Sequence, residues 1–74
     1  MAYLSEIRPG EKAVYLGCQS GREAINRLTS LGFTPGAEVS MLQNYGHGPL
    51  VVVVRGARVA LGREEAKRIQ VGVR

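Results

Sequence analysis

The chain has 74 residues, of which 45% are apolar and 22% charged, and its formal net charge is +4. A chain of this length forms one domain, which we expect to span residues 1–74, and the composition excludes a disordered tail or a low-complexity linker. The longest uninterrupted apolar run, Leu50 to Val54, is far shorter than the roughly 20 residues that a membrane helix needs, and the N-terminus has no pattern of a secretion signal. One cysteine cannot form an internal disulfide, so we expect a cytoplasmic protein.

Residue types that carry catalysis or bind metals are scarce. Asp and Trp are absent, and Cys18 and His47 are the only thiol and imidazole. A tetrahedral zinc site needs four ligands, and a Cys–His nucleophile pair needs an orienting group and an oxyanion donor. We therefore expect no enzyme activity, no cofactor and no metal site. Cys18 is interpreted as a small core residue rather than a redox or metal-binding thiol, and His47 as a solvated loop side chain rather than a metal or partner contact.

The beginning of the chain predicts a short helical turn and a strand. Leu4 and Ile7 are spaced as on one turn of helix, and Pro9-Gly10 has the residue preferences of a type II turn. Residues 11–17 are rich in apolar and aromatic side chains, which favours a strand.

An amphipathic helix is predicted at about residues 22–31. Apolar residues recur at i, i+4 and i+7 from Ala24. Ser20 and Glu23 match a capping box at the start of the helix, and Gly32 stands where a left-handed C-terminal cap is expected. This helix is expected to bury one face against the rest of the domain.

The remainder of the chain predicts four more strands and one short helical turn. The strands are expected at residues 37–43, 50–55, 58–62 and 69–73, with a polar loop at 44–49 and the helical turn near 63–68. Pro35-Gly36 introduces the first of these strands, and Gly56-Ala57 is predicted to form a two-residue hairpin turn. About five short strands and one helix in a small domain favour a mainly β fold, a small barrel or strongly bent sheet.

The predicted hairpin sorts its side chains into two faces. A turn at Gly56-Ala57 pairs residue 54 with 59 and residue 53 with 60. The predicted inner face is entirely apolar: Leu50, Val52, Val54, Val59 and Leu61. The predicted outer face, a candidate partner-binding surface, holds Val51, Val53, Arg55, Arg58 and Ala60.

Two interpretations of this outer face remain open. It could contact a partner, or it could be an ordinary solvated strand pair, because β-propensity alone favours valine. Tyr45 and His47, on the preceding loop, are placed at the border of the surface. The Tyr45 ring suits an interface, and it could equally lie across the mouth of the barrel.

The net charge is confined to the end of the chain. Residues 1–54 contain four cations and four anions, whereas residues 55–74 contain six cations and two anions. The alternative function is therefore binding of RNA or DNA through Arg55, Arg58, Arg63, Lys67 and Arg68. No aromatic residue is interleaved with these cations, which disfavours single-strand binding by stacking.

The order of these elements resembles the FeoA family, small proteins of bacterial ferrous iron uptake, over nearly the whole chain. The residues that carry the resemblance are Leu4-Ser5-Glu6-Ile7, Pro9-Gly10, Arg27-Leu28, Leu31-Gly32-Phe33-Thr34-Pro35-Gly36, Glu38-Val39, Gly48-Pro49, Val52, Val54-Arg55-Gly56, Ala60-Leu61, Arg63-Glu64-Glu65-Ala66 and Ile69. The single pieces are weak, but the ordered set at these spacings is fairly specific.

This resemblance implies an SH3-like β-barrel, similar also to the C-terminal domain of iron-dependent repressors. It implies a non-enzymatic adaptor or regulator that binds the cytoplasmic part of FeoB, a membrane permease with a GTP-binding domain. The chain would then be cytoplasmic and peripheral to the inner membrane through that partner, and weak homo-oligomerisation is left open. Val51 and Val53 stand at outward positions where polar residues are expected in the family.

Overall fold

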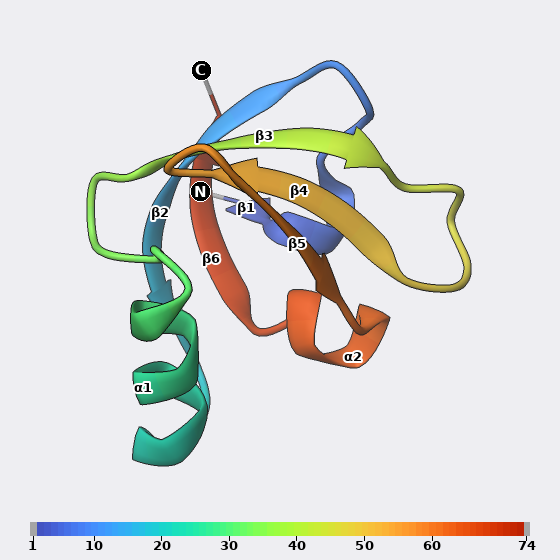
Figure 1. Ribbon diagram of the computed structural model, residues 1–74. Coiled ribbons are helices and arrows are strands. Elements are labelled where there is room, and N and C mark those ends of the chain that lie inside the picture. The colour runs from blue at the N-terminus through green and yellow to red at the C-terminus, as the bar shows by residue number, and fades with distance from the viewer. Residues whose placement is uncertain (1, 74) are drawn as a thin grey trace.

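The computed structural model describes residues 2–73, which form one six-stranded antiparallel sheet with two short helices and one 3-10 turn (Figure 1). The elements are β1 Ala2–Tyr3, η1 Leu4–Glu6, β2 Lys12–Cys18, α1 Arg22–Ser30, β3 Glu38–Gln43, β4 Leu50–Val54, β5 Ala57–Leu61, α2 Arg63–Ala66 and β6 Ile69–Val73. The strand order is β1-β6-β2-β3-β4-β5. The predicted mainly β fold, its one amphipathic helix and its short helical turn are confirmed.

The strand that sequence reasoning missed is β1. Ala2 pairs with Val71 and Tyr3 with Gln70, both antiparallel, along the margin of β6. Two residues are too few to show the alternation by which a strand is recognised. This strand therefore exists through its pairing alone.

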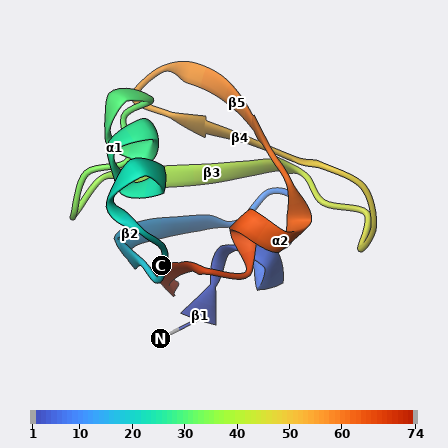
Figure 2. The same ribbon diagram turned by 90° about the horizontal axis from the view of Figure 1, so that it is seen from below.

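Two bulges help the sheet to curl. The register shifts in β2 between Tyr15 and Gly17, and in β3 between Met41 and Gln43. Each shift inserts one extra residue, Leu16 or Leu42, and such insertions increase the local twist of a strand. Figure 2 shows the strands curving around a common interior, with α2 at one end.

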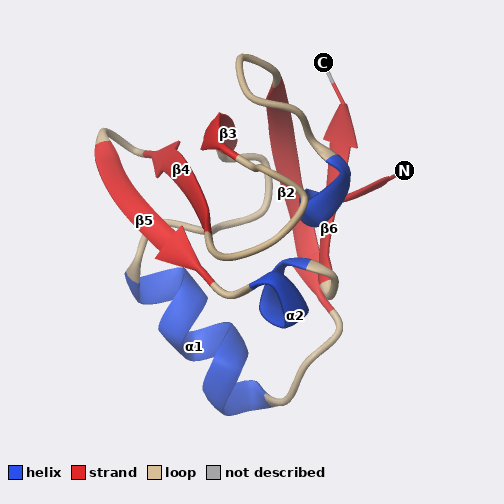
Figure 3. Ribbon diagram, turned by 90° about the vertical axis from the view of Figure 1, so that its right-hand side faces the viewer, coloured by secondary structure: helices blue, strands red, loops and turns tan. Residues whose placement is uncertain are grey.

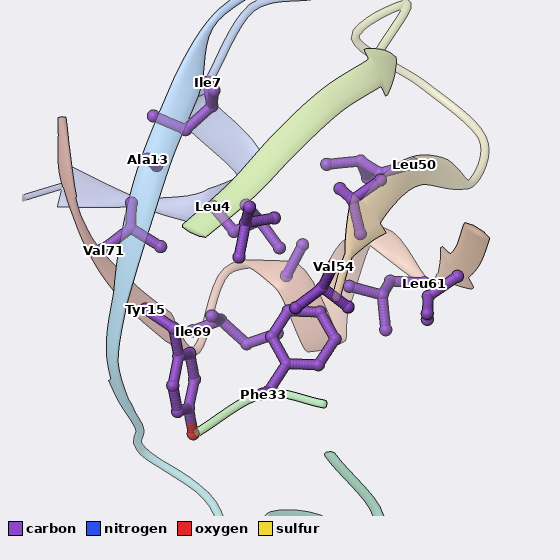
Figure 4. Packing of buried hydrophobic residues seen from close by; sticks show 14 of the residues in the cluster. Leu4, Ile7, Ala13, Tyr15, Phe33, Leu50, Val54, Leu61, Ile69 and Val71 are labelled. Atoms are coloured by element: carbon purple, nitrogen blue, oxygen red, sulfur yellow. The ribbon is translucent and has the colours of Figure 1, made fainter. Parts of the chain in front are cut away.

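The interior is filled by apolar side chains from the strands β2 to β6 and from both helices. The Tyr15 and Phe33 rings meet edge to face, with centroids 5.6 Å apart and planes at 70° (Figure 4). Among residues 2–73, no polar or charged residue is buried in this core. The core therefore comprises Leu4, Ile7, Ala13, Tyr15, Leu28, Phe33, Ala37, Val39, Met41, Leu50, Val52, Val54, Val59, Leu61, Ala66, Ile69 and Val71.

The two Pro-Gly turns form as predicted. The Glu11 amide donates to the Arg8 carbonyl at 3.0 Å, and the Ala37 amide donates to the Thr34 carbonyl at 2.9 Å. These are the first-to-fourth-residue hydrogen bonds of β-turns. Each turn places the chain for the strand that follows it.

The helix α1 ends as predicted but starts differently. The Phe33 amide donates to the Leu28 carbonyl and the Gly32 amide to the Thr29 carbonyl, both at 3.0 Å, with Gly32 at φ +109°. This is a Schellman cap, and the accompanying contact is between two fully buried residues, Leu28 and Phe33. The predicted capping box is wrong: the helix begins at Arg22, so Gly21 is the N-cap and no side chain caps it.

Two contacts hold the C-terminal part of α1. Arg27, in its last turn, forms an ion pair with Glu65 of α2, and Arg55, in the turn before β5, donates to the Gly32 carbonyl. Figure 3 shows α1 beside α2. The helix is therefore attached to the two segments that precede and follow β5 in the chain.

Candidate partner-binding site

The hairpin turn between β4 and β5 lies one residue earlier than predicted. Its central residues are Arg55 and Gly56, at φ +50° and +80°, and the observed pairs are Val54–Ala57 and Val53–Arg58. The predicted turn at Gly56-Ala57, with its pairs 54/59 and 53/60, is wrong. Sequence reasoning placed glycine first because a non-glycine residue seldom adopts positive φ. The contacts that hold Arg55 at positive φ come from residues far along the chain, and the sequence does not reveal them.

The assignment of side chains to the two faces survives this error. Moving the turn by one residue shifts the pairing by two, and side chains alternate with a period of two. Val52 and Val54 are 0% exposed, whereas Val51 and Val53 are half-buried and face outward. Across the hairpin, Arg58 and Ala60 are exposed. The predicted inner and outer faces are therefore confirmed.

Arg55 is not part of the outer row. Its side chain instead connects the hairpin turn to the residues that follow α1. Its Nε donates to the Gly32 carbonyl at 3.3 Å, and its Nη2 donates to the Thr34 hydroxyl at 2.6 Å. Its stem packs where a side chain at Gly32 would stand, with Cγ 3.4 Å from that Cβ position. The predicted pair of arginines at the edge of the outer row is thus reduced to Arg58.

A shallow hollow of 330 Å³ lies beside this turn, lined by Ala37, Glu38, Ser40, Val53, Arg55 and Gly56. Ser40 pairs with Val53 across β3 and β4, and Arg58 pairs with Val53 across β4 and β5. Cross-strand partners lie on the same face of a sheet. Ser40, Val53 and Arg58 therefore form one outward row that spans three strands at the hollow.

Tyr45 and His47 lie at the other end of the hairpin. Both are exposed, Tyr45 to 70%, on the loop between β3 and β4, at the end of β4 opposite the turn (Figure 1). They adjoin Val51 rather than Arg55 in the sheet, because Val51 pairs with Gln43 just before that loop. They thus border the outer face at one end.

Asn44, which the sequence did not single out, anchors this loop. Its Nδ2 donates to the Ser5 carbonyl at 3.0 Å and to the Ile7 carbonyl at 2.8 Å. Its Oδ1 accepts from Arg63 Nη2 at 2.8 Å and from the Gly46 amide at 3.3 Å. An isolated Asn in a polar loop predicts only a turn, so the sequence carried no signal for these contacts.

The cations proposed for nucleic-acid binding are largely engaged. Arg55 is bound to the α1 cap, Arg63 to Asn44, and Lys67 to Glu64 at 2.9 Å. Arg58 and Arg68 are exposed, and within residues 2–73 neither has a side-chain hydrogen bond or ion pair. Intramolecular contacts compete with phosphate for three of the five side chains, which weakens this alternative.

Residues with titratable or metal-binding groups form no further site in the described part of the chain. No group of three or more His, Cys or acidic residues is placed to hold a metal ion within residues 2–73. Cys18, at the end of β2, is half-buried and packs against the core, as its interpretation as a core residue expects. No described helix is long and apolar enough to cross a membrane.

The curled six-stranded sheet and its Schellman-capped helix define a small β-barrel, and Val51 and Val53 face outward on it. The FeoA domain model matches residues 3–73, and the chain belongs to the FeoA family. This is a family of iron-transport accessory proteins without catalytic activity. The resemblance stated from the sequence is confirmed.

Known relatives agree with this assignment. "Putative Fe(2+) transport protein A" of Methanocaldococcus jannaschii is 29% identical over 68 residues, which are 92% of this chain and 82% of that protein. A crystal structure of an iron uptake regulatory protein (FeoA) has a TM-score of 0.91 and 36% identity, covering 99% of this chain and 97% of its own.

Two further structures share this fold, and the first of them shows that it is SH3-like. Zinc-complexed FeoA of Stenotrophomonas maltophilia, described as an SH3 domain protein, has a TM-score of 0.83 and 37% identity over 96% of this chain and 89% of its own. A manganese-dependent transcriptional repressor has a TM-score of 0.88 at 20% identity, covering 99% of this chain and 36% of its own. The latter similarity concerns the fold alone.

Proposed function

We propose that this chain regulates ferrous iron uptake by docking on the cytoplasmic part of the FeoB permease. The family carries the iron-transport part of this proposal. Relatives described as an "Iron Uptake Regulatory Protein" and as "Possibly Acting as a Bacterial Ferrous Iron Transport Activating Factor" support a regulatory role. The chain itself would remain non-catalytic and would stay at the inner membrane only while bound to its partner.

The outer face of β4 and β5 is the docking surface in this proposal. Val51 and Val53 offer apolar area there, and Arg58 is a cation without an ion-pair partner within residues 2–73. A contact surface commonly combines an apolar centre with charges that select and orient the partner. Ala60 extends the face, Arg55 closes it at the turn, and Tyr45 and His47 border its far end.

Regulation would follow from unequal affinity for two states of the partner. An effector shifts an equilibrium only as far as its binding free energies to the two states differ. If the GTP-bound and GDP-bound forms of FeoB present different surfaces, docking of this face favours one of them. The mechanism requires no nucleotide site on this chain.

The first test replaces Val53 and Arg58 together. The double variant Val53→Glu, Arg58→Glu should lose binding to the FeoB cytoplasmic domain by at least tenfold, because both substitutions place carboxylates on the docking face. Binding is measured by calorimetry with the domain in its GTP-analogue and GDP forms. The thermal midpoint of the variant should change little, because both side chains face outward.

A matched control makes the same changes on another surface. Leu16 is 48% exposed in β2 and Arg22 is exposed at the start of α1, so Leu16→Glu, Arg22→Glu alters the charge equally. This control should bind as the wild type does. Equal binding by both double variants would remove the β4–β5 face from the proposal, and absence of binding by the wild type to either form would remove FeoB as the partner.

A further inference from the structure

Hydrogen-bond donors lie in and beside the hollow at the hairpin turn. A guanidinium has five N–H donors, and Arg55 commits its Nε and one Nη2 hydrogen to Gly32 and Thr34. The Arg55 side chain also lines the hollow. The Ser40 hydroxyl and the whole Arg58 guanidinium lack a hydrogen-bond partner within residues 2–73.

The sheet arranges these donors around one aliphatic side chain. Val53 lines the hollow, with Ser40 as its neighbour on β3 and Arg58 as its neighbour on β5. Directly opposed residues in an antiparallel sheet have Cβ atoms about 4.5–5.5 Å apart. A ligand group above Val53 is therefore within reach of a hydroxyl on one side and a guanidinium on the other.

We propose that the row Ser40–Val53–Arg58, with Arg55 at its turn end, is a binding site for a glutamate or aspartate side chain in an acidic segment of a partner protein. Its carboxylate accepts from the Arg58 guanidinium and the Ser40 hydroxyl, while a neighbouring aliphatic residue of the segment packs on Val53. The inference deepens the proposed function, since it names the chemistry that the docking face recognises. It rests on that proposal only for the identity of the partner.

Charge beside the hollow favours this occupant. Arg55 lines the hollow, and Arg58, the β5 neighbour of Val53, stands next to its lining. Glu38 also lines the hollow, on the side nearest β2, where it pairs with Val14. A carboxylate is attracted to the guanidinium groups and therefore binds on the Arg58 side of Val53.

The test uses the full chain and two peptides that differ by one functional group. Acetyl-Leu-Glu-Leu-amide and acetyl-Leu-Gln-Leu-amide are titrated into the labelled protein while amide NMR shifts are recorded. The Glu peptide should give saturable shifts at Ser40, Val53 and Gly56, and the Gln peptide should bind about fivefold more weakly, because charged hydrogen bonds exceed neutral ones. Raising the salt concentration should weaken the Glu peptide only.

Two single variants separate this site from general attraction to a basic protein. Arg58→Gln should weaken the Glu peptide about fivefold, in the range that exposed charge pairs contribute. Arg22→Gln, on exposed α1, should leave it unchanged. Thermal unfolding of each variant confirms that it is folded.

Several outcomes would overturn the inference. These are equal binding of the two peptides, an equal effect of Arg22→Gln and Arg58→Gln, or saturable binding of inorganic phosphate at the same amides with no preference for the Glu peptide. If neither peptide binds while the chain still binds FeoB, this inference is wrong and the proposed function stands. Peptide binding without FeoB binding removes the proposed partner and leaves the carboxylate site in place.

Discussion

Tyr15 is the titratable side chain of the described core. It is 3% exposed, and its ring packs against Phe33. Burial, and to a smaller extent the charge of nearby Cys18, raises the pKa of the Tyr15 phenol above its ordinary value of 10.0. The fold therefore disfavours the tyrosinate, and its stability depends on this phenol staying protonated.

We predict that alkaline pH destabilises the fold through Tyr15. The unfolded chain releases the phenolic proton first, so the contribution is fully present below pH 10 and is lost as pH rises through the raised pKa of the folded state. Tyr15→Phe should show a smaller fall in free energy of unfolding between pH 8 and pH 10.5, measured with urea. Tyr45→Phe, at an exposed position, should keep the wild-type slope. An unchanged slope in Tyr15→Phe would contradict the assignment.

At the scale of elements, side-chain contacts fix segments that have no regular structure of their own. Asn44 joins the loop after β3 to η1 and to α2, and Arg55 joins the hairpin turn to the cap of α1. Arg63 Nε is buried without a hydrogen-bond partner within residues 2–73, so Arg63 is held through its Nη2 contact with Asn44. The contacts of Asn44 and Arg55 therefore fix the positions of the two ends of the β4–β5 face.

The Asn44 anchor predicts a measurable loss of stability. Asn44→Ala removes the donor to two carbonyls, those of Ser5 and Ile7, and should lower the free energy of unfolding by about 1–3 kcal/mol, the cost of leaving such groups unpaired. Urea unfolding measures the change. Asn26→Ala, on the exposed side of α1, serves as the control and should stay within about 0.5 kcal/mol of the wild type. A similar small change in Asn44→Ala would show that the anchor contributes little.

For the whole molecule, one small core supports both the curled sheet and the helix α1. Leu28 is the buried residue of α1 and also accepts the Phe33 hydrogen bond that ends the helix. A chain of 74 residues has a total stability of only about 4–11 kcal/mol, at roughly 0.05–0.15 kcal/mol per residue. The docking of α1 is therefore a large part of what keeps the barrel folded.

Truncation of Leu28 tests this dependence. Leu28→Ala should cost about 2–5 kcal/mol, since it removes a fully buried side chain and leaves a cavity. Circular dichroism and tyrosine fluorescence should report one cooperative transition at a lower denaturant concentration. Leu16→Ala, at a half-exposed site on a bulge, should change the midpoint little. A separate early loss of helix in Leu28→Ala, with the sheet intact, would contradict a shared core.

Sequence alone determined the mainly β fold, the single helix with its Gly32 cap, the two Pro-Gly turns, and the inner and outer faces of β4 and β5. These features depend on local conformational preference and on alternation with a period of two. Both can be recognised from residues that are close together in the sequence. The tertiary structure alone decided the two-residue strand β1, the turn at Arg55-Gly56 and the Asn44 anchor. Each of these depends on a partner far along the chain: β6 for β1, the α1 cap for Arg55, and η1 with α2 for Asn44. Such contacts exist only once the sheet has curled and brought its ends together.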